Sequence, residues 1–523
     1  MIARSAGLSG AATLVSRVLG VGRDLVLAAF FGAGNQMDAF LVAFRFPNLV
    51  RDLFAEGAMS AAFVPVFTRQ VTERGRQEAF RLGVHVINAL VLVTGTLVIL
   101  GLVFAEPLVR FYAGDYAAVP GKIDLTVQLT RITLPFLTLV AVAAVMMGML
   151  NALHHYFVPA LAPAMFNLVV IVAVPLLVPF MGRWGLAAIM AVAIATLLGG
   201  VAQVITQWPA LRREGFDYAP RVDVRDAGLA RVLLLMGPGT IGLAATQVNL
   251  YINTLLATAQ GTGAVSWLSY AFRLMYFPIG LFGVSIATAV LPEAARHAAR
   301  SDSRGIGETL SKGLGLMLFL NVPATVGLVV LATPIVRLLF ERGEFRPEDT
   351  AATAAALRFY AVGLIGYATA RIATPVFYTL GQNRRTVVVA TASMGVNVVA
   401  SVLLANAMGF TGLALGTSIA ALAHAAVALW LLRGDLEGFD VLALSSTLVR
   451  IAIASLVMGS IVRLIPVNPD AGTIGQAAGV GSAIAIGVMV YAAAAKLLRV
   501  AELSDVLAAA RARVNSAGPR VSA

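Results

Sequence analysis

Long blocks of apolar residues alternate with short polar breaks along almost the whole chain of 523 residues. A helix that crosses a membrane needs about 20 mostly apolar residues, and charged residues, Pro or Gly mark the breaks between such helices. The pattern therefore predicts an all-α polytopic membrane protein with about 14 transmembrane helices. The expected spans are 8–31, 38–67, 80–104, 125–151, 157–181, 184–208, 228–258, 264–292, 309–332, 350–380, 386–408, 411–432, 442–465 and 472–498.

Composition excludes several other classes of protein. The chain is 59% hydrophobic and 12% charged, whereas soluble domains average about 45–50% and about 25%. A single soluble domain and a disordered or fibrous chain are therefore both excluded. There is no cysteine, which excludes disulfides, thiolate metal sites and thiol nucleophiles. In a membrane protein the net charge of +12 is read first as charge in cytoplasmic loops, so nucleic-acid binding is not expected.

The basic residues predict the orientation. If the N-terminus is cytoplasmic, Arg and Lys in the loops favour the cytoplasmic side by about three to one. With an even number of spans, both termini are then cytoplasmic. The loops are short, so no separate soluble domain is expected. Arg17, Arg23 and Asp24 interrupt any apolar core after Met1, which argues against a cleaved signal peptide.

Charged residues are concentrated in the first two spans. A charge at the bilayer centre costs about 2.5–3.5 kcal/mol even on the mildest scale, so these side chains must face one another or a water-filled cavity. One interpretation is a set of ion pairs that fixes helix packing, as for Asp24 with Arg17 or Arg23. The other is a binding site. The residues concerned are Arg17, Arg23, Asp24, Asp38, Arg45, Arg51, Asp52 and Glu56.

Arg273 favours the binding interpretation, because no acidic residue lies in its span between residues 265 and 292. A guanidinium group matches phosphate oxygens bidentately and keeps its charge. We therefore expect a cargo that carries a phosphate or diphosphate. The candidate substrate-binding residues are Arg17, Arg23, Asp24, Arg51 and Arg273, and the candidates for coupling or gating are Asp38, Glu56 and Arg45.

No energy-supplying site is expected within the chain. The only Gly-Lys pair, Gly121-Lys122, is followed by Ile123, so there is no P-loop for ATP. The five histidines form no cluster with metal-ligand spacing, and neither a metal nor a cofactor is expected. An energised process would draw on the membrane potential or an ion gradient. Asp24, Asp38 and Glu56 are the candidate titrating groups, and the ion is left open.

Two segments suggest an internal repeat. Ala43-Phe44-Arg45-Phe46-Pro47 in the second span is echoed by Ala271-Phe272-Arg273 and Phe277-Pro278 in the eighth. Each of these spans also ends with a proline, Pro65 or Pro292. Both spans point the same way, so the pattern predicts a parallel repeat of six spans, as in transporters with two similar lobes.

Further motifs surround the charged residues. They are Ser16-Arg17-Val18-Leu19-Gly20, Arg23-Asp24, Phe31-Gly32-Ala33-Gly34, Asp38-Ala39-Phe40, Pro47-Asn48, Arg51, Phe54-Ala55-Glu56-Gly57-Ala58, Phe63-Val64-Pro65, Arg273-Leu274, Phe277-Pro278, Gly283-Val284, Leu291-Pro292, Phe340, Arg342-Gly343 and Phe345. At these residues the sequence resembles the MviN/MurJ family of lipid II flippases, in the superfamily of multidrug, oligosaccharidyl-lipid and polysaccharide exporters. The likeness is nearly continuous over the first 65 residues and is one of hydropathy alone beyond about Gly381.

The resemblance implies a domain organisation and a function. Residues 1–225 would form an N-lobe of spans 1–6, and residues 226–435 a C-lobe of spans 7–12 around a cationic cavity. Residues 436–500 would form a groove for a lipid tail, and residues 501–523 a cytoplasmic tail. The implied activity is that of a transporter, not an enzyme: movement of undecaprenyl-diphosphate-linked peptidoglycan precursor from the cytoplasmic to the periplasmic leaflet of the bacterial inner membrane, by alternating access. Arg17, Arg23, Arg51 and Arg273 match cavity arginines of the family, and Asp24 and Asp38 match its motif acids.

The implied partners are lipid II and the bilayer, with cell-wall synthesis proteins as further candidates. A sodium-linked cycle has been proposed for part of the family, but here Asn397 and Ser401 stand on the eleventh span and the seventh has no acid, so no sodium site is expected. An alternative function is export of drugs or of another polyprenyl-linked glycan on the same fold. A membrane enzyme would require acids on a sizeable loop, and a scaffold would tolerate loss of the cavity arginines.

Overall fold

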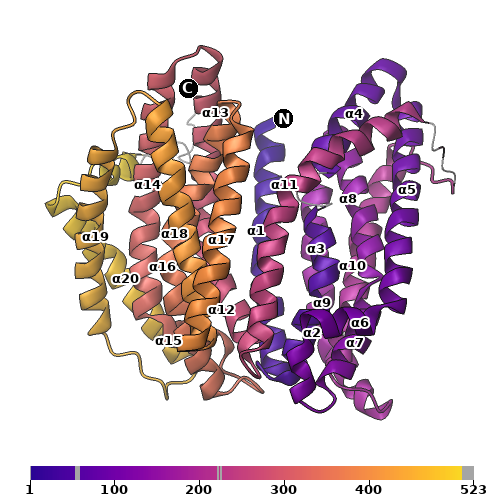
Figure 1. Cartoon of the computed structure of the whole chain (residues 1–523), viewed down its shortest axis with the longest axis horizontal. Coiled ribbons are helices and arrows are strands. Elements are labelled where there is room, and N and C mark those ends of the chain that lie inside the picture. The colour runs from indigo at the N-terminus through magenta and orange to yellow at the C-terminus, as the bar shows by residue number, and fades with distance from the viewer. Residues whose placement is uncertain (1, 54–58, 221–222, 224–225, 509–523) are drawn as a thin grey trace, which may run out of the picture. The chain divides into compact units, whose positions relative to one another are not determined.

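The computed structural model describes residues 2–53, 59–220, 223 and 226–508. Within these ranges it leaves out the side chains of residues 2–11, 50–53, 59–61, 237–246, 248 and 284–285. Every regular element in the described ranges is a helix (Figure 1). This confirms the all-α fold class.

The chain divides into two compact units, one of Met1–Ser266 with Arg342–Arg346 and one of Trp267–Glu341 with Pro347–Ala523. The helices up to Thr258 are α1 (Ile2–Phe31), α2 (Asn35–Ala43), α3 (Arg45–Leu53), α4 (Met59–Arg74), α5 (Arg76–Val103), α6 (Ala105–Tyr112), η2 (Gly114–Ala118), α7 (Lys122–Thr133), α8 (Phe136–Ala152), α9 (Phe157–Arg183), α10 (Met190–Arg213) and α11 (Ala227–Thr258). The later helices are α12 (Ala264–Pro278), η3 (Ile279–Gly283), α13 (Val284–Ala299), α14 (Ser303–Val330), α15 (Ala332–Phe340), α16 (Pro347–Thr379), α17 (Asn383–Met408), α18 (Phe410–Asp435), α19 (Val441–Arg463) and α20 (Thr473–Leu497).

Membrane-spanning helices account for most of the described chain. Ten helices are long and apolar enough to cross a membrane, and the bent pair α12 and α13 makes an eleventh, by length and composition and among the described residues only. Each of the eleven coincides with one predicted span. The other three predicted spans, the first, second and seventh, coincide with α1, with α2 to α4 and with α11. The protein is thus a multi-pass membrane protein, consistent with about 14 spans.

The second predicted span is divided rather than continuous. Helix α2 ends at Ala43 and α3 begins at Arg45, so the break falls at Phe44. Pro47 explains its position, because a proline ring clashes with the carbonyl group four residues earlier and removes a backbone donor. The proline in the sequence thus accounts for the division of this span into two helices.

The eighth predicted span is also interrupted, in the segment that follows Pro278. Helix α12 ends at Pro278 and a π-helical turn, η3, follows it. The helix axis bends by 49° between Ala264–Gly283 and Ile286–Ala299. Both segments that suggested an internal repeat therefore coincide with helix breaks, while the repeat itself stays a prediction.

The first unit packs around an aromatic core between α4, α5 and α8. Phe63, Phe67 and Phe80 are buried, with ring centroids 5.3 Å apart for Phe63 and Phe67 and 6.1 Å apart for Phe67 and Phe80. Gly148 of α8 makes this packing close, because a Cβ atom there would lie 2.8 Å from the Phe63 ring. Phe216 extends the core to the segment after α10.

The second unit has two buried clusters that meet along α14. In the first cluster α14 packs with α16 and α18, which lie side by side (Figure 1). In the second, α19 and α20 pack on α14, and the Tyr491 hydroxyl donates a hydrogen bond to the Phe319 carbonyl at 2.7 Å. Helices α19 and α20 therefore belong to the second unit by packing, and α11 belongs to the first. The domain boundaries implied by the family resemblance stay predictions.

Candidate functional site

Arg23 and Asp24 form an ion pair in the second half of α1. The Arg23 Nη2 and Nε atoms lie 2.9 and 3.1 Å from Asp24 Oδ1. Arg23 Nη1 also donates to Asn167 Oδ1 of α9 at 3.1 Å, and Asn167 Nδ2 donates to the Ser16 carbonyl at 3.1 Å. The side chains of Arg23 and Asp24 are only 21% and 10% exposed. The group therefore fastens α1 to α9, as the ion-pair interpretation expects, and a role in substrate binding stays a prediction.

Asp38 lies at the centre of a fully buried polar cluster. Its Oδ2 atom accepts hydrogen bonds from Lys122 Nζ at 3.0 Å and from the Gly263 N–H at 2.7 Å. Its Oδ1 atom accepts from the Ser266 N–H at 3.0 Å and from the Ser266 hydroxyl at 2.7 Å. Asp38 is 0% exposed. The carboxylate thus pairs with the first residue of α7 and caps the N-terminus of α12, where a negative charge is favoured.

Lys122 was not among the predicted site residues, although it completes this cluster. Its side chain is only 2% exposed, and Nζ lies 3.9 Å from the centroid of the Tyr116 ring, which adds a cation–π contact. The sequence places Lys122 at the end of a predicted loop, 84 residues after its partner. No local pattern could have revealed the pair.

Arg45 binds α11 from the start of α3. Its Nε and Nη2 atoms donate to Thr254 Oγ1 at 3.0 and 2.8 Å. The ring of Phe46, the residue that follows Arg45, packs against two tyrosine rings. The ring centroids lie 4.8 Å apart for Phe46 and Tyr112 and 5.3 Å apart for Phe46 and Tyr251. Arg45 thus links two helices of the first unit, and its gating role stays a prediction.

The structure gives less detail for the other three predicted site residues in the first part of the chain. Arg17 lies on α1 with an exposed side chain. Arg51 lies on α3, and its side chain is outside the described part. Glu56 falls in residues 54–58, outside the described residues. Their predicted roles stay predictions.

Arg273 lies on α12 within the second unit, and its side chain is exposed. The rings of its neighbours Phe272 and Tyr276 stack with centroids 5.8 Å apart, and Tyr367 of α16 lies 6.1 Å from Phe272. The helix therefore presents a fixed cation beside an aromatic surface.

Arg371 of α16 is a second cation of this kind that the sequence analysis did not single out. It is exposed, and a Cβ atom built on Gly283 would lie 3.9 Å from its Cγ atom. The sequence did hold the signal, because no Asp or Glu occurs between residues 350 and 434. Arg371 thus meets the same criterion that selected Arg273.

A family profile and individual relatives match this chain to the same family. A sequence profile of the family described as "Lipid II flippase MurJ" matches residues 27–473. A relative from Vibrio cholerae, named probable lipid II flippase MurJ, is 34% identical over 433 residues, which cover 81% of each chain. A relative of the same name from Rhizobium meliloti is 35% identical over 457 residues, covering 86% of this chain and 84% of its own.

Solved structures show the same fold. A structure of the lipid II flippase MurJ in an inward closed conformation is 26% identical, with a TM-score of 0.78 over 94% of this chain and 98% of its own. An inward-facing multidrug transporter of the MATE family is 17% identical, with a TM-score of 0.69 over 80% of this chain and 94% of its own. At that level of identity, the second likeness shows the fold alone.

Proposed function

The chain belongs to the MurJ family of lipid II flippases, and we propose that it moves undecaprenyl-diphosphate-linked peptidoglycan precursor from the cytoplasmic to the periplasmic leaflet of the bacterial inner membrane. The members named in the comparisons are flippases, which are transporters rather than enzymes. The proposed partners are accordingly lipid II and the surrounding bilayer, and cell-wall synthesis proteins are the further candidates. Both termini are proposed to be cytoplasmic.

The observation that carries the proposal is the exposed guanidinium of Arg273 on a segment without carboxylates. Residues 265–292 contain no Asp or Glu, so this span supplies a basic residue and no acidic one. A diphosphate offers oxygens that a guanidinium group can bind in pairs. Arg371 adds a second exposed cation in the same unit. These features support an anionic head group as the transported part.

Alternating access is the mechanism that we infer. Two units, each with its own buried core, can move as bodies, and the two lobes would expose the cargo site to one leaflet and then to the other. The polyprenyl tail would stay in lipid, along the groove assigned to α19 and α20. The driving force would be the membrane potential or an ion gradient. Asp38, held by Lys122 and by the start of α12, fits a gate that fastens one state, and Asp24 and Glu56 are the other candidate titrating groups.

The proposal is tested in a bacterium whose own flippase can be depleted. The chain is expected to restore growth and outward movement of lipid-linked precursor, measured as accessibility of the precursor at the periplasmic face. Arg273→Ala is expected to abolish both while the protein still accumulates in the membrane. The matched control is Arg450→Ala, which removes an exposed arginine from α19. Normal growth on Arg273→Ala as the only flippase would overturn the site assignment.

Export of drugs or of another polyprenyl-linked glycan is the competing function. The likeness to a multidrug transporter of the MATE family supports the shared fold and does not extend to the cargo. Saturable binding of organic cations, together with failure to support growth, would favour export. Because the chain has no native cysteine, single cysteines at Arg273 or Asp38 can report access from each side of the membrane for either cargo.

A further inference from the structure

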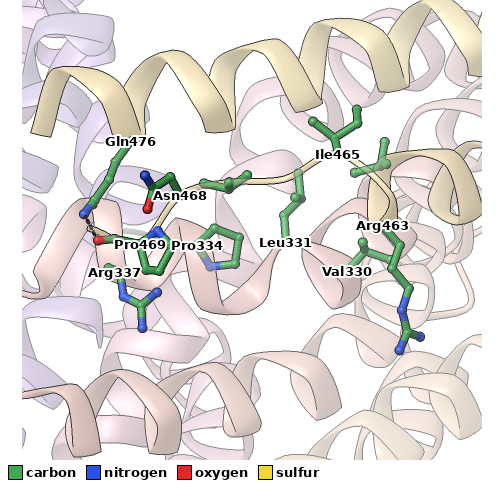
Figure 2. Close-up of a pocket in the computed structure, with 11 residues that line it drawn as sticks. Val330, Leu331, Pro334, Arg337, Arg463, Ile465, Asn468, Pro469 and Gln476 are labelled. Atoms are coloured by element: carbon green, nitrogen blue, oxygen red, sulfur yellow. Dashed lines mark hydrogen bonds between the residues drawn. The ribbon is translucent and has the colours of Figure 1, made fainter. Parts of the chain in front are cut away.

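A pocket of about 220 Å³ lies within the second unit, at the end of α19 (Figure 2). Its walls come from the junction of α14 and α15, from the loop between α19 and α20, and from the start of α20. The floor is apolar and includes Leu331 and Pro334. The polar lining residues are Arg337, Arg463, Asn468 and Gln476.

The lining carries two positive charges and no carboxylate. Arg337 Nε lies 3.2 Å from Glu341 Oε2, one turn further along the chain, and its terminal nitrogens make no hydrogen bond with any described residue. Arg463, at the end of α19, makes neither a hydrogen bond nor an ion pair within the described part of the chain. In Figure 2 the two guanidinium groups extend in the same direction from opposite ends of the pocket. The pocket is therefore charged to receive an anion.

The amide side chains complete the polar rim. Gln476 Nε2 donates to the Pro469 carbonyl at 2.8 Å (Figure 2), which holds the loop against α20. Asn468 Oδ1 accepts from the Asp470 N–H at 2.9 Å. Its Nδ2 group makes no hydrogen bond within the described chain and stays available as a donor. Asp470 is exposed and is not part of the lining.

The surroundings of the pocket are apolar and exposed. Leu464 next to Arg463 is 81% exposed, Ile474 on α20 is 87% exposed and Ile461 on α19 is 39% exposed. These residues lie at the ends of two helices that are apolar enough to cross a membrane. Helix ends of this kind lie at the head-group level of a bilayer, where basic side chains and lipid phosphates meet. An anion bound here would carry acyl chains over the adjacent apolar surface.

The predicted topology makes the two arginines unusual. It places Arg337 and Arg463 on the side opposite the cytoplasm, where few basic residues occur in the loops. Two of those few line a single pocket. Basic pockets between membrane helices bind the head groups of anionic lipids.

We propose that this pocket binds the phosphate of an anionic phospholipid. Arg463 donates to the phosphate oxygens at one end of the pocket. At the other end, the terminal nitrogens of Arg337 and Asn468 Nδ2 donate to the remaining head-group oxygens, and the acyl chains lie over Leu464 and Ile461. The bound lipid links α15 to the loop between α19 and α20. This inference concerns a resident membrane lipid, and it does not depend on the cargo proposed above.

The test measures lipid binding to the purified full chain in detergent micelles by native mass spectrometry. Phosphatidylglycerol is titrated against zwitterionic phosphatidylcholine, with inorganic phosphate as a separate arm. The expected result is saturable binding of phosphatidylglycerol, weakened about tenfold by Arg463→Gln, because hydrogen bonds to charged groups are the strong ones. Arg450→Gln, near the middle of the same helix, is the control and is expected to leave the affinity unchanged.

Arg463 has no partner among the described residues, so Arg463→Gln is expected to keep the unfolding temperature of the lipid-free protein. Arg337→Gln provides a second measurement from the opposite end of the pocket and is expected to weaken binding in the same way. Equal binding of phosphatidylcholine, equal weakening by Arg450→Gln, or unchanged affinity in both pocket variants would overturn the proposal. Inorganic phosphate that binds as tightly as the lipid would overturn the assignment of a lipid.

Discussion

Two ion pairs in the first unit contrast with two exposed arginines in the second. In the first unit Asp38 and Lys122 are paired with side-chain exposures of 0% and 2%, and Arg23 is paired with Asp24. In the second unit Arg273 and Arg371 are exposed on helices of the membrane region. Their surroundings in the sequence, residues 265–292 and 350–434, contain no carboxylate.

An ionised residue in a membrane helix can stabilise the fold or bind the cargo. Which of the two it does depends on the groups that surround its charge. A buried pair has already exchanged its hydration for fixed contacts, and removal of one member leaves an uncompensated charge. An exposed guanidinium on a span whose sequence contains no carboxylate can offer its permanent charge to a ligand. We therefore expect substitutions in the first unit to change stability first, and substitutions in the second to change transport first.

The largest effect on stability is expected at the buried pair. Lys122→Ala leaves the Asp38 carboxylate without its counter-charge in a site closed to water, which costs about 3–5 kcal/mol. Thermal unfolding of the detergent-purified protein measures the loss. The double variant Asp38→Asn with Lys122→Met removes both charges and keeps one acceptor oxygen, for either the Gly263 or the Ser266 N–H group, so it is expected to be milder. Wild-type stability of Lys122→Ala would refute the architectural role.

A smaller loss of stability is expected at the other pair of the first unit. Asp24→Asn removes the charge that holds Arg23 beside Asn167, and a hydrogen bond to a charged group contributes about 1.5–3 kcal/mol. The same unfolding measurement checks this value. If Asp24→Asn abolishes transport at unchanged stability, Asp24 acts on the cargo, and the structural role assigned to this pair is wrong.

Arg371→Gln is expected to act on transport instead. Loss of one guanidinium contact with an anionic head group corresponds to a decrease of about tenfold, with the unfolding temperature unchanged. The rate at which precursor becomes accessible at the periplasmic face measures the effect. Arg358→Gln on the same helix is the control, since Arg358 already donates to Thr333 Oγ1 at 2.9 Å. An unchanged transport rate in Arg371→Gln would show that Arg371 does not bind the head group.

The smallest effect is expected at a partly exposed pair outside the membrane spans. The pKa of Asp302 lies below its ordinary value of 3.8, because the Gly305 N–H and then His297 donate hydrogen bonds to the carboxylate. A lowered pKa contributes stability that is present in full above the ordinary value and is lost as the pH falls through the folded-state pKa. Asp302→Asn is expected to flatten the acid limb of unfolding measured from about pH 7 to about pH 2. An unchanged acid limb would contradict this assignment.

Much of the fold could be predicted because each span carries its own apolar signal. The break at Phe44 followed from Pro47, and the Arg23–Asp24 pair followed from adjacent opposite charges. Helices α6 and α15, of eight and nine residues, lay in predicted loops or at span ends, because a criterion of about 20 apolar residues does not detect short helices. Lys122 could not be predicted, because its partner Asp38 is far away in the sequence. Arg371 could have been predicted, because its span contains no acidic residue, which is the criterion that selected Arg273.

One connection of the chain limits how the two units can move. Residues 342–346 belong to the first unit although the chain on both sides of them belongs to the second. There the Glu344 N–H donates to the Ala29 carbonyl at 2.9 Å. Gly32 and Gly343 allow the approach, since a Cβ atom at either position would lie under 2.5 Å from a backbone oxygen. The polypeptide thus passes between the units three times, after Ser266, Glu341 and Arg346. Any rotation of one unit against the other must bend or release all three tethers together, so a cross-link that stiffens the short returning loop should slow turnover without touching a single cargo-binding group.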